Sequence, residues 1–242
     1  MRLEGQLTEG FFLERLNRFA AAVEVAGRRE LAHVANSGRM HEVLLPRVPV
    51  LLRPAAHLGR KTAYDLVMVR LENQLISVDA RLPSALVHEA LLEGRISGLE
   101  SYRNIRREVR YGAHRLDLLA LPPEGLAQNG GPCLIEAKSI TLVVGGCALF
   151  PDAPTLRGAR HMAALLRFRQ EGHKAAVVFV IQRDDARSFS PNDQADPQFG
   201  RALREASAGG VMVRAFLCKV GLEEICLDRE VPVYLPLAGS PS

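Results

Sequence analysis

The hydrophobic pattern of this chain changes its period near residue 80, and this change constrains the fold more than any other feature. Before that point the apolar residues form short runs of strand length, separated by turn-forming residues. After it, segments of helix length alternate with apolar strands. Two patterns in one chain predict two domains, 1–82 and 83–242, and a chain of 242 residues is long enough to hold both.

The first domain is predicted to be a small β-barrel. Closing a short sheet into a barrel removes the exposed edges that it would otherwise carry. Five strands in about 80 residues is the size of an OB-type barrel, a fold that often binds nucleic acid. The expected strands, with no convincing helix between them, are 19–25, 31–35, 48–52, 64–69 and 75–78.

The second domain is predicted to be a mixed α/β sheet flanked by helices, which makes the whole chain an α+β protein. Its first helix is expected to begin at Ala85, with Ser84 as its cap, and to stop at Gly94. The element order is αβββαβαβ. The later elements are expected at 106–111, 115–121, 133–140, 156–170, 175–181, 198–208 and 211–219.

Two neighbouring strands of this domain carry the clearest chemical signal. Asp117 lies among apolar residues on one strand, and Glu136 and Lys138 share one face of the next. A hairpin would bring Asp117 beside Glu136, where two carboxylates repel each other and lose hydration. Such hard oxygen ligands suit Mg²⁺ or Mn²⁺, and Lys138 could position or deprotonate the attacking water or neutralise charge on a phosphate. Glu89, on the preceding helix, is a third candidate ligand.

This set of residues, in this order of elements, is the PD-(D/E)xK nuclease pattern. We therefore predict catalytic roles for Asp117, Glu136 and Lys138, and metal binding by Glu89, Asp117 and Glu136. A structural alternative stays open, in which Asp117 and Lys138 form an ion pair and Glu136 lies at a solvated strand end. On the same grounds, Glu89 alone would be a solvent-facing helix residue, and His161 a surface or satisfied residue.

A second group of residues favours contact with nucleic acid. The chain has 31 basic and 27 acidic residues, and the positive excess lies in its first third. In residues 11–19, arginines are interleaved with aromatic residues. Guanidinium groups bind phosphates, and aromatic side chains can stack on bases. In the alternative interpretation, Phe12, Leu16 and Phe19 fill the barrel core. The residues predicted to bind DNA are Arg15, Arg18, Arg28, Arg29 and Arg39.

The chain is expected to be cytoplasmic. Its first residues are charged throughout and lack the apolar segment of a signal peptide. No stretch approaches the roughly 20 apolar residues of a membrane span. The four cysteines show no CxxC spacing and are expected to be reduced thiols, with neither a zinc site nor a disulfide.

Eight segments between about residues 12 and 233 form a collinear series of motifs. They are AHVANSGR (32–39), RKTAYD (60–65), LPSALVHEA (82–90), RREVRYG (106–112), EAKSITL (136–142), FPDAPT (150–155), RGARH (157–161) and FSPN (189–192). This series resembles the sugar fermentation stimulation protein A (SfsA) family. The resemblance implies an N-terminal OB-like domain, a C-terminal PD-(D/E)xK-like domain, and a prokaryotic DNA-binding protein linked to regulation of sugar (maltose) metabolism.

Three functions are compatible with these observations. The first is sequence-tolerant binding of duplex DNA through Arg–phosphate contacts, which would weaken with salt and need no metal. The second is a Mg²⁺- or Mn²⁺-dependent DNA endonuclease. The third is a protein-interaction module on the same folds. Binding ranks first because the family resemblance and the domain types both support it. Nuclease folds also occur in proteins that bind without cutting. Exposed sheet edges in either domain could also support a homodimer.

Overall fold

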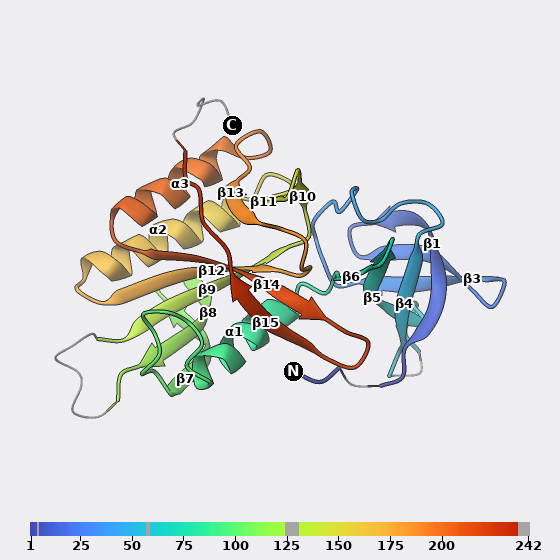
Figure 1. Ribbon diagram of the computed structural model, residues 1–242, viewed down its shortest axis with the longest axis horizontal. Coiled ribbons are helices and arrows are strands. Elements are labelled where there is room, and N and C mark those ends of the chain that lie inside the picture. The colour runs from blue at the N-terminus through green and yellow to red at the C-terminus, as the bar shows by residue number, and fades with distance from the viewer. Residues whose placement is uncertain (4, 57–58, 124–130, 237–242) are drawn as a thin grey trace.

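The computed structural model describes residues 1–3, 5–56, 59–123 and 131–236 (Figure 1). A barrel formed by the first third of the chain lies beside a larger domain, in which helices cover both faces of a sheet (Figure 1). Within the described ranges, no helix is both long and apolar enough to cross a membrane.

Six strands build the N-terminal domain: β1 (Thr8–Asn17), β2 (Ala20–Val25), β3 (Arg28–Val34), β4 (Pro49–Pro54), β5 (Tyr64–Leu71) and β6 (Gln74–Ser77). They lie in the order β3-β2-β1-β4-β5-β6, and β3 also pairs with β5. The barrel therefore closes through β3 and β5, while β6 extends the sheet from β5. The predicted OB-like barrel is confirmed.

The barrel differs from the prediction at its first strand. The expected first strand begins only at residue 19, whereas β1 starts at residue 8 and pairs with both β2 and β4. Phe12 lies in the barrel core, but Leu16 and Phe19 are 45% and 50% exposed, so the alternative that all three fill the core is wrong for two of them. Register shifts within the β1–β2 pair break the alternation of inward and outward residues. An irregular strand of this kind does not give a clean period-2 signal.

The second domain contains three helices and nine strands among its described residues. They are α1 (Leu82–Leu92), β7 (Asn104–Tyr111), β8 (His114–Leu121), β9 (Cys133–Ile140), β10 (Val143–Val144), β11 (Cys147–Phe150), α2 (Leu156–Gln170), β12 (Lys174–Ile181), β13 (Ser188–Pro191), α3 (Pro197–Ala208), β14 (Met212–Val220) and β15 (Ile225–Glu230). The predicted mixed sheet with flanking helices is confirmed, in the strand order β15-β14-β12-β9-β8-β7.

Both faces of this sheet are buried. Along β12, Val177 and Phe179 belong to the core that includes residues of α2 and α3, while Val178 and Val180 belong to the core under α1. A strand covered on both sides is expected to be apolar throughout, and β12 is apolar and buried at every position after Lys174. The two cores therefore fix which helix lies over which face, and the positions of the site residues follow from this.

The start of α1 differs from the prediction. The helix begins at Leu82 rather than Ala85, and its N-cap residue is Arg81, whose side chain makes no capping hydrogen bond. Pro83 lies in the first turn, where its fixed φ suits a helix and its missing N–H leaves no hydrogen bond unmade. Ser84 therefore lies inside the helix and is not its cap. Gly94 adopts a φ of +70° just after the helix end, close to the predicted stop.

A small second sheet is absent from the predicted element order. β10, β11 and β13 form this three-stranded sheet, and β15 adds an edge to the central sheet. These strands have between two and six residues. Segments so short contain too few alternations for a periodic pattern to stand out from loop sequence.

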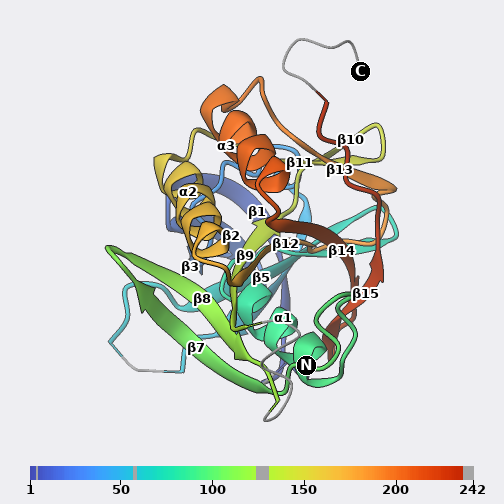
Figure 2. The ribbon, with the colours of Figure 1, turned by 90° about the vertical axis from the view of Figure 1, so that its left-hand side faces the viewer.

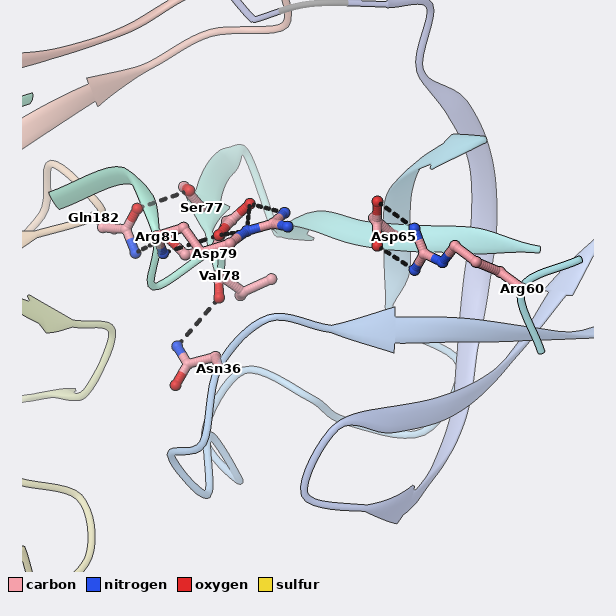
Figure 3. Close-up of polar contacts among 8 residues, drawn as sticks. All are labelled: Asn36, Arg60, Asp65, Ser77, Val78, Asp79, Arg81 and Gln182. Carbon is pink, nitrogen blue, oxygen red and sulfur yellow. Dashed lines mark hydrogen bonds and ion pairs between the residues drawn. The ribbon is translucent and has the colours of Figure 1, made fainter. Parts of the chain in front are cut away.

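A buried polar network joins the two domains where β6 leads into α1 (Figure 3). Ser77 Oγ donates to Gln182 Oε1 at 2.9 Å, and Gln182 Nε2 donates to the Asp79 carbonyl oxygen at 3.2 Å and to Ser139 Oγ at 2.9 Å. Ser77 and Gln182 are 0% exposed. Because buried polar groups are costly to leave unpaired, this network holds the barrel against the end of the central sheet.

Candidate functional site

A cleft of about 680 Å³ lies at the junction of the two domains. The barrel contributes Arg18 and Phe19 from the β1–β2 turn and the loop segment Asn36–Gly38 after β3. The other domain contributes residues of β9 and the segment 149–157, which leads into α2. Three of the four predicted nuclease-type residues line this cleft: Asp117, Glu136 and Lys138.

β9 places Glu136 and Lys138 together at this cleft. Lys138 Nζ lies 2.6 Å from Glu136 Oε1, and the two side chains are 13% and 6% exposed. His161 Nδ1, from α2, lies 2.5 Å from the same oxygen. Burial by itself raises the pKa of Glu136, but Lys138 and His161 outweigh it and lower the pKa to about 2. Glu136 is therefore ionised at neutral pH.

Asp117 lies on β8 beside this pair. The β8–β9 ladder ends at the Leu118–Ile135 pair, and one step further the Asp117 carboxylate accepts a hydrogen bond from the Ala137 N–H at 2.8 Å. Burial, and then the charge of Glu136, raise the pKa of Asp117 to about 6. The site thus holds two neighbouring carboxylates whose pKa values are shifted in opposite directions. The alternative of an Asp117–Lys138 pair with a solvated Glu136 differs from this arrangement, since Lys138 pairs with a buried Glu136.

One oxygen of Glu136 lacks a partner. Glu136 Oε2 is buried and has no hydrogen-bond partner among the described residues. An unsatisfied charged acceptor destabilises a fold, which is a reason to look for a ligand there. Together with the Asp117 carboxylate it offers hard oxygen donors of the kind that Mg²⁺ or Mn²⁺ takes. The residues present therefore fit such a cation.

The predicted third ligand does not join these two. Glu89 lies on α1, which packs on the opposite face of the sheet from α2 and His161. Its Oε2 accepts a hydrogen bond from the Met1 ammonium at 2.9 Å. No group of three or more His, Cys, Asp or Glu residues is placed to hold a metal in the parts of the chain that the structure describes. The structure thus brings Asp117 and Glu136 together and leaves Glu89 apart from them. Mg²⁺ commonly completes a set of one or two carboxylates with water and substrate phosphate.

His161 is a site residue that the sequence pattern did not identify. It is 3% exposed on α2, and Arg157 Nε donates to its Nε2 at 3.4 Å. Because Nε2 accepts, the ring proton is assigned to Nδ1, which donates to Glu136. Such partners orient a functional carboxylate and hold it in place. The helical spacing of Arg157 and His161 was visible in the sequence, but burial of the ring was not.

The comparisons with known proteins agree with this architecture. The family model of the SfsA N-terminal OB domain matches residues 13–78, and that of the sugar fermentation stimulation protein RE domain matches residues 81–224. The chain belongs to the SfsA family.

Relatives along the whole length support the assignment. The chain is 44% identical over 230 residues to a sugar fermentation stimulation protein homolog of Desulforamulus reducens, covering 95% of this chain and 93% of the relative. It is 44% identical over 238 residues to the Moorella thermoacetica homolog, covering 97% and 100%. A solved structure of Pyrococcus furiosus SfsA in complex with Ca²⁺ is similar with a TM-score of 0.85 and 31% identity, covering 97% of this chain and 99% of that one.

In this SfsA-family chain, two of the five predicted DNA-binding arginines lie at the cleft. Arg18 is exposed and lines it, and Arg39 is exposed next to the cleft residue Gly38. Arg28 and Arg29 lie beyond the other end of β2, a strand of six residues or about 20 Å. Arg29 also pairs with Glu14. The structure therefore separates these two arginines from the cleft.

Arg15 is occupied within the barrel. Its guanidinium donates to five backbone carbonyl oxygens at 2.6–3.2 Å: those of Asn17, Arg18, Asn36, Gly38 and Arg39. These carbonyls belong to the two barrel segments that form one wall of the cleft. Arg15 therefore shapes the cleft wall from behind.

This difference leads to a test. Arg15→Gln is expected to lower the free energy of unfolding by about 2 kcal/mol, since several charge-assisted hydrogen bonds are lost. Arg18→Gln is exposed and is expected to change it by less than about 0.5 kcal/mol. Urea denaturation of both variants measures this, and equal stability of the two would contradict the structural role of Arg15.

Proposed function

We propose that this SfsA-family protein binds duplex DNA in the cleft between its two domains. The observation that carries the proposal is the composition of the two walls. Arg18 projects from the barrel, and Lys138 and Arg157 lie on the opposite side of the same cleft. Guanidinium and ammonium groups on facing walls suit a polyanion, and OB barrels commonly bind nucleic acid. Affinity should fall steeply with salt, because phosphate contacts release counterions.

A specific observation favours a second function, divalent-metal-dependent cleavage of DNA. Glu136 is ionised and buried with one unpartnered oxygen, next to Asp117. These two residues would hold Mg²⁺ or Mn²⁺, and the P. furiosus relative is described in complex with Ca²⁺, another cation that prefers oxygen ligands. The cation would supply Lewis-acid polarisation of a phosphoryl oxygen. Two carboxylates alone would repel a phosphodiester, so this function requires the cation.

The residues around the carboxylates have roles in such a reaction. Lys138 lies against Glu136 and faces the cleft, where its ammonium can orient water or offset charge on a phosphate. His161 holds Glu136 from the helix side and keeps its carboxylate in one orientation. The barrel wall would position the duplex across these groups, since phosphate contacts fix register without reading sequence.

One gel tests both functions. Supercoiled plasmid is incubated with the wild-type protein and with Lys138→Ala, in Mn²⁺, Mg²⁺ or EDTA and at two salt concentrations. We expect retardation that weakens with salt, and metal-dependent nicking that Lys138→Ala loses. Retardation by a variant that circular dichroism shows to be folded should persist in weakened form, through Arg18 and Arg157. Nicking that persists in the variant indicates a contaminating nuclease and contradicts the assigned site.

The remaining outcomes separate the alternatives. Retardation that ignores EDTA, without nicking, leaves a DNA-binding protein on a nuclease-like scaffold and excludes cleavage. Absence of salt-dependent retardation contradicts DNA binding and favours a protein-interaction module. The biological role that we propose for the binding activity is regulation of sugar (maltose) metabolism in the cytoplasm.

A further inference from the structure

Helix α2 carries a row of arginines on one side. Arg157, Arg160 and Arg167 are all exposed, and the helix contains no Asp or Glu. With 3.6 residues per turn, the three positions fall within an arc of about 80° around the helix axis. Their separation of ten residues corresponds to about 15 Å along the helix. We call these three residues the α2 arginine stripe.

The stripe has no acidic counterpart. None of its members forms an ion pair with a carboxylate within the part of the molecule that the structure covers. Instead, Arg157 donates to His161, and Arg167 Nη2 lies 3.4 Å from His114 Nε2. Glu171, just beyond the helix, accepts a hydrogen bond from the Tyr111 hydroxyl.

The imidazole ring of His114, which lies beside Arg167, is affected by the uncompensated charge of the stripe. Burial, followed by the electrostatic effects of His161, Arg167 and Arg160, lowers the pKa of His114. Guanidinium groups that no carboxylate pairs, such as those of the stripe within the described residues, repel one another in the free protein. They attract a polyanion from solution and gain most when one binds.

The stripe is continuous with the proposed DNA cleft. Arg157 lines the cleft, and α2 runs from there away from the barrel, as Figure 1 shows. Figure 2 shows α2 on the outside of the domain, near the β7–β8 hairpin. A duplex that enters the cleft beside Glu136 would therefore pass along this helix.

We propose that the α2 arginine stripe follows the phosphates of one strand of a DNA duplex whose neighbouring segment lies in the cleft. The proposal rests on DNA binding as the proposed function. Each step along one strand rises 3.4 Å and also turns around the duplex axis, so the 15 Å of the stripe spans about three consecutive phosphates of that strand. Exposed guanidinium groups are well suited to phosphate oxygens because they bind them in a two-pronged manner.

The test uses the double variant Arg160→Gln/Arg167→Gln, because Arg157 also contacts His161. The matched control is Arg201→Gln/Arg229→Gln, which removes the same charge from exposed positions on α3 and β15. Binding of a short fluorescein-labelled duplex is measured by anisotropy in EDTA across a series of KCl concentrations. Circular dichroism melts confirm that both variants fold.

Each outcome bears on the proposal separately from the proposed function. We expect the stripe variant to bind more weakly and to reduce the slope of log K against log salt by about 2, while the control keeps the wild-type slope. A stripe variant that binds like wild type overturns the stripe and leaves DNA binding in place. An equal loss in the control attributes the effect to net charge and also overturns it. If the wild-type chain shows no salt-dependent binding, the proposed function itself fails.

Discussion

Asp117→Asn is expected to stabilise the metal-free protein by up to about 3 kcal/mol at about pH 8. Burial and the charge of Glu136 raise the pKa of Asp117 from 3.8 to about 6. The folded protein therefore binds this proton more tightly than the unfolded chain does. Protonated Asp117 therefore stabilises the folded protein. This stabilisation is fully present below the pKa that Asp117 has in the unfolded chain, and it is lost as the pH rises through about 6. Asparagine is neutral throughout, and its amide oxygen can still accept from the Ala137 N–H.

Urea denaturation in EDTA across a pH series measures this effect. The difference between Asp117→Asn and wild type should shrink to near zero below about pH 4, where Asp117 is protonated in both states. Asp228→Asn, at an exposed position of β15, is the matched control and should show little change. A destabilised Asp117→Asn at high pH would refute the expectation.

Urea denaturation with and without Mn²⁺ tests the proposed metal site. Added Mn²⁺ should stabilise the wild-type protein, because a ligand that binds only the folded state adds to its stability. The gain should be lost in Asp117→Asn, which removes one of the two carboxylates. A residue that destabilises the metal-free protein and stabilises the metal-bound protein is typical of a functional position. Equal stabilisation of both proteins by Mn²⁺ would place the ion elsewhere.

Lys138→Met is expected to destabilise the protein by about 3–5 kcal/mol, because it leaves a buried carboxylate without its cationic partner. Glu136 is 6% exposed and would keep only His161. Because the pKa of Glu136 is lowered, its ionised carboxylate stabilises the folded protein at any pH above its ordinary pKa of 4.5. This stabilisation is lost as the pH falls toward about 2. Without Lys138 the pKa of Glu136 rises, so the stability should be lost at higher pH.

A double-mutant cycle decides this prediction. Glu136→Gln/Lys138→Met replaces the ion pair by neutral groups of similar size and should recover most of the lost stability. Lys219→Met, at an exposed position of β14, is the control for the loss of a lysine and should cost little. A double variant as unstable as Lys138→Met alone would show that Glu136 does not depend on Lys138.

Much of the fold could be predicted from the sequence because its signals are local. Short apolar runs separated by turn residues in the first third correctly predicted a barrel. Helix-length segments alternating with apolar strands later in the chain correctly predicted a mixed sheet. Elements without a clean period were missed or misplaced, namely the irregular β1 and the strands of the small sheet. The predicted cap at Ser84 was also wrong, because α1 begins at Leu82 with Pro83 in its first turn.

For the site, the sequence alone determined which residues share a strand face. Side chains alternate with period 2, so Glu136 and Lys138 had to point the same way, and a hairpin with the preceding strand could bring Asp117 beside them. Only the tertiary structure decided which helix covers that face. It placed α2 with His161 over Glu136 and left Glu89 on the other side with the Met1 ammonium. The reason is physical: a local period fixes direction within an element, whereas the packing of distant elements fixes what each face meets.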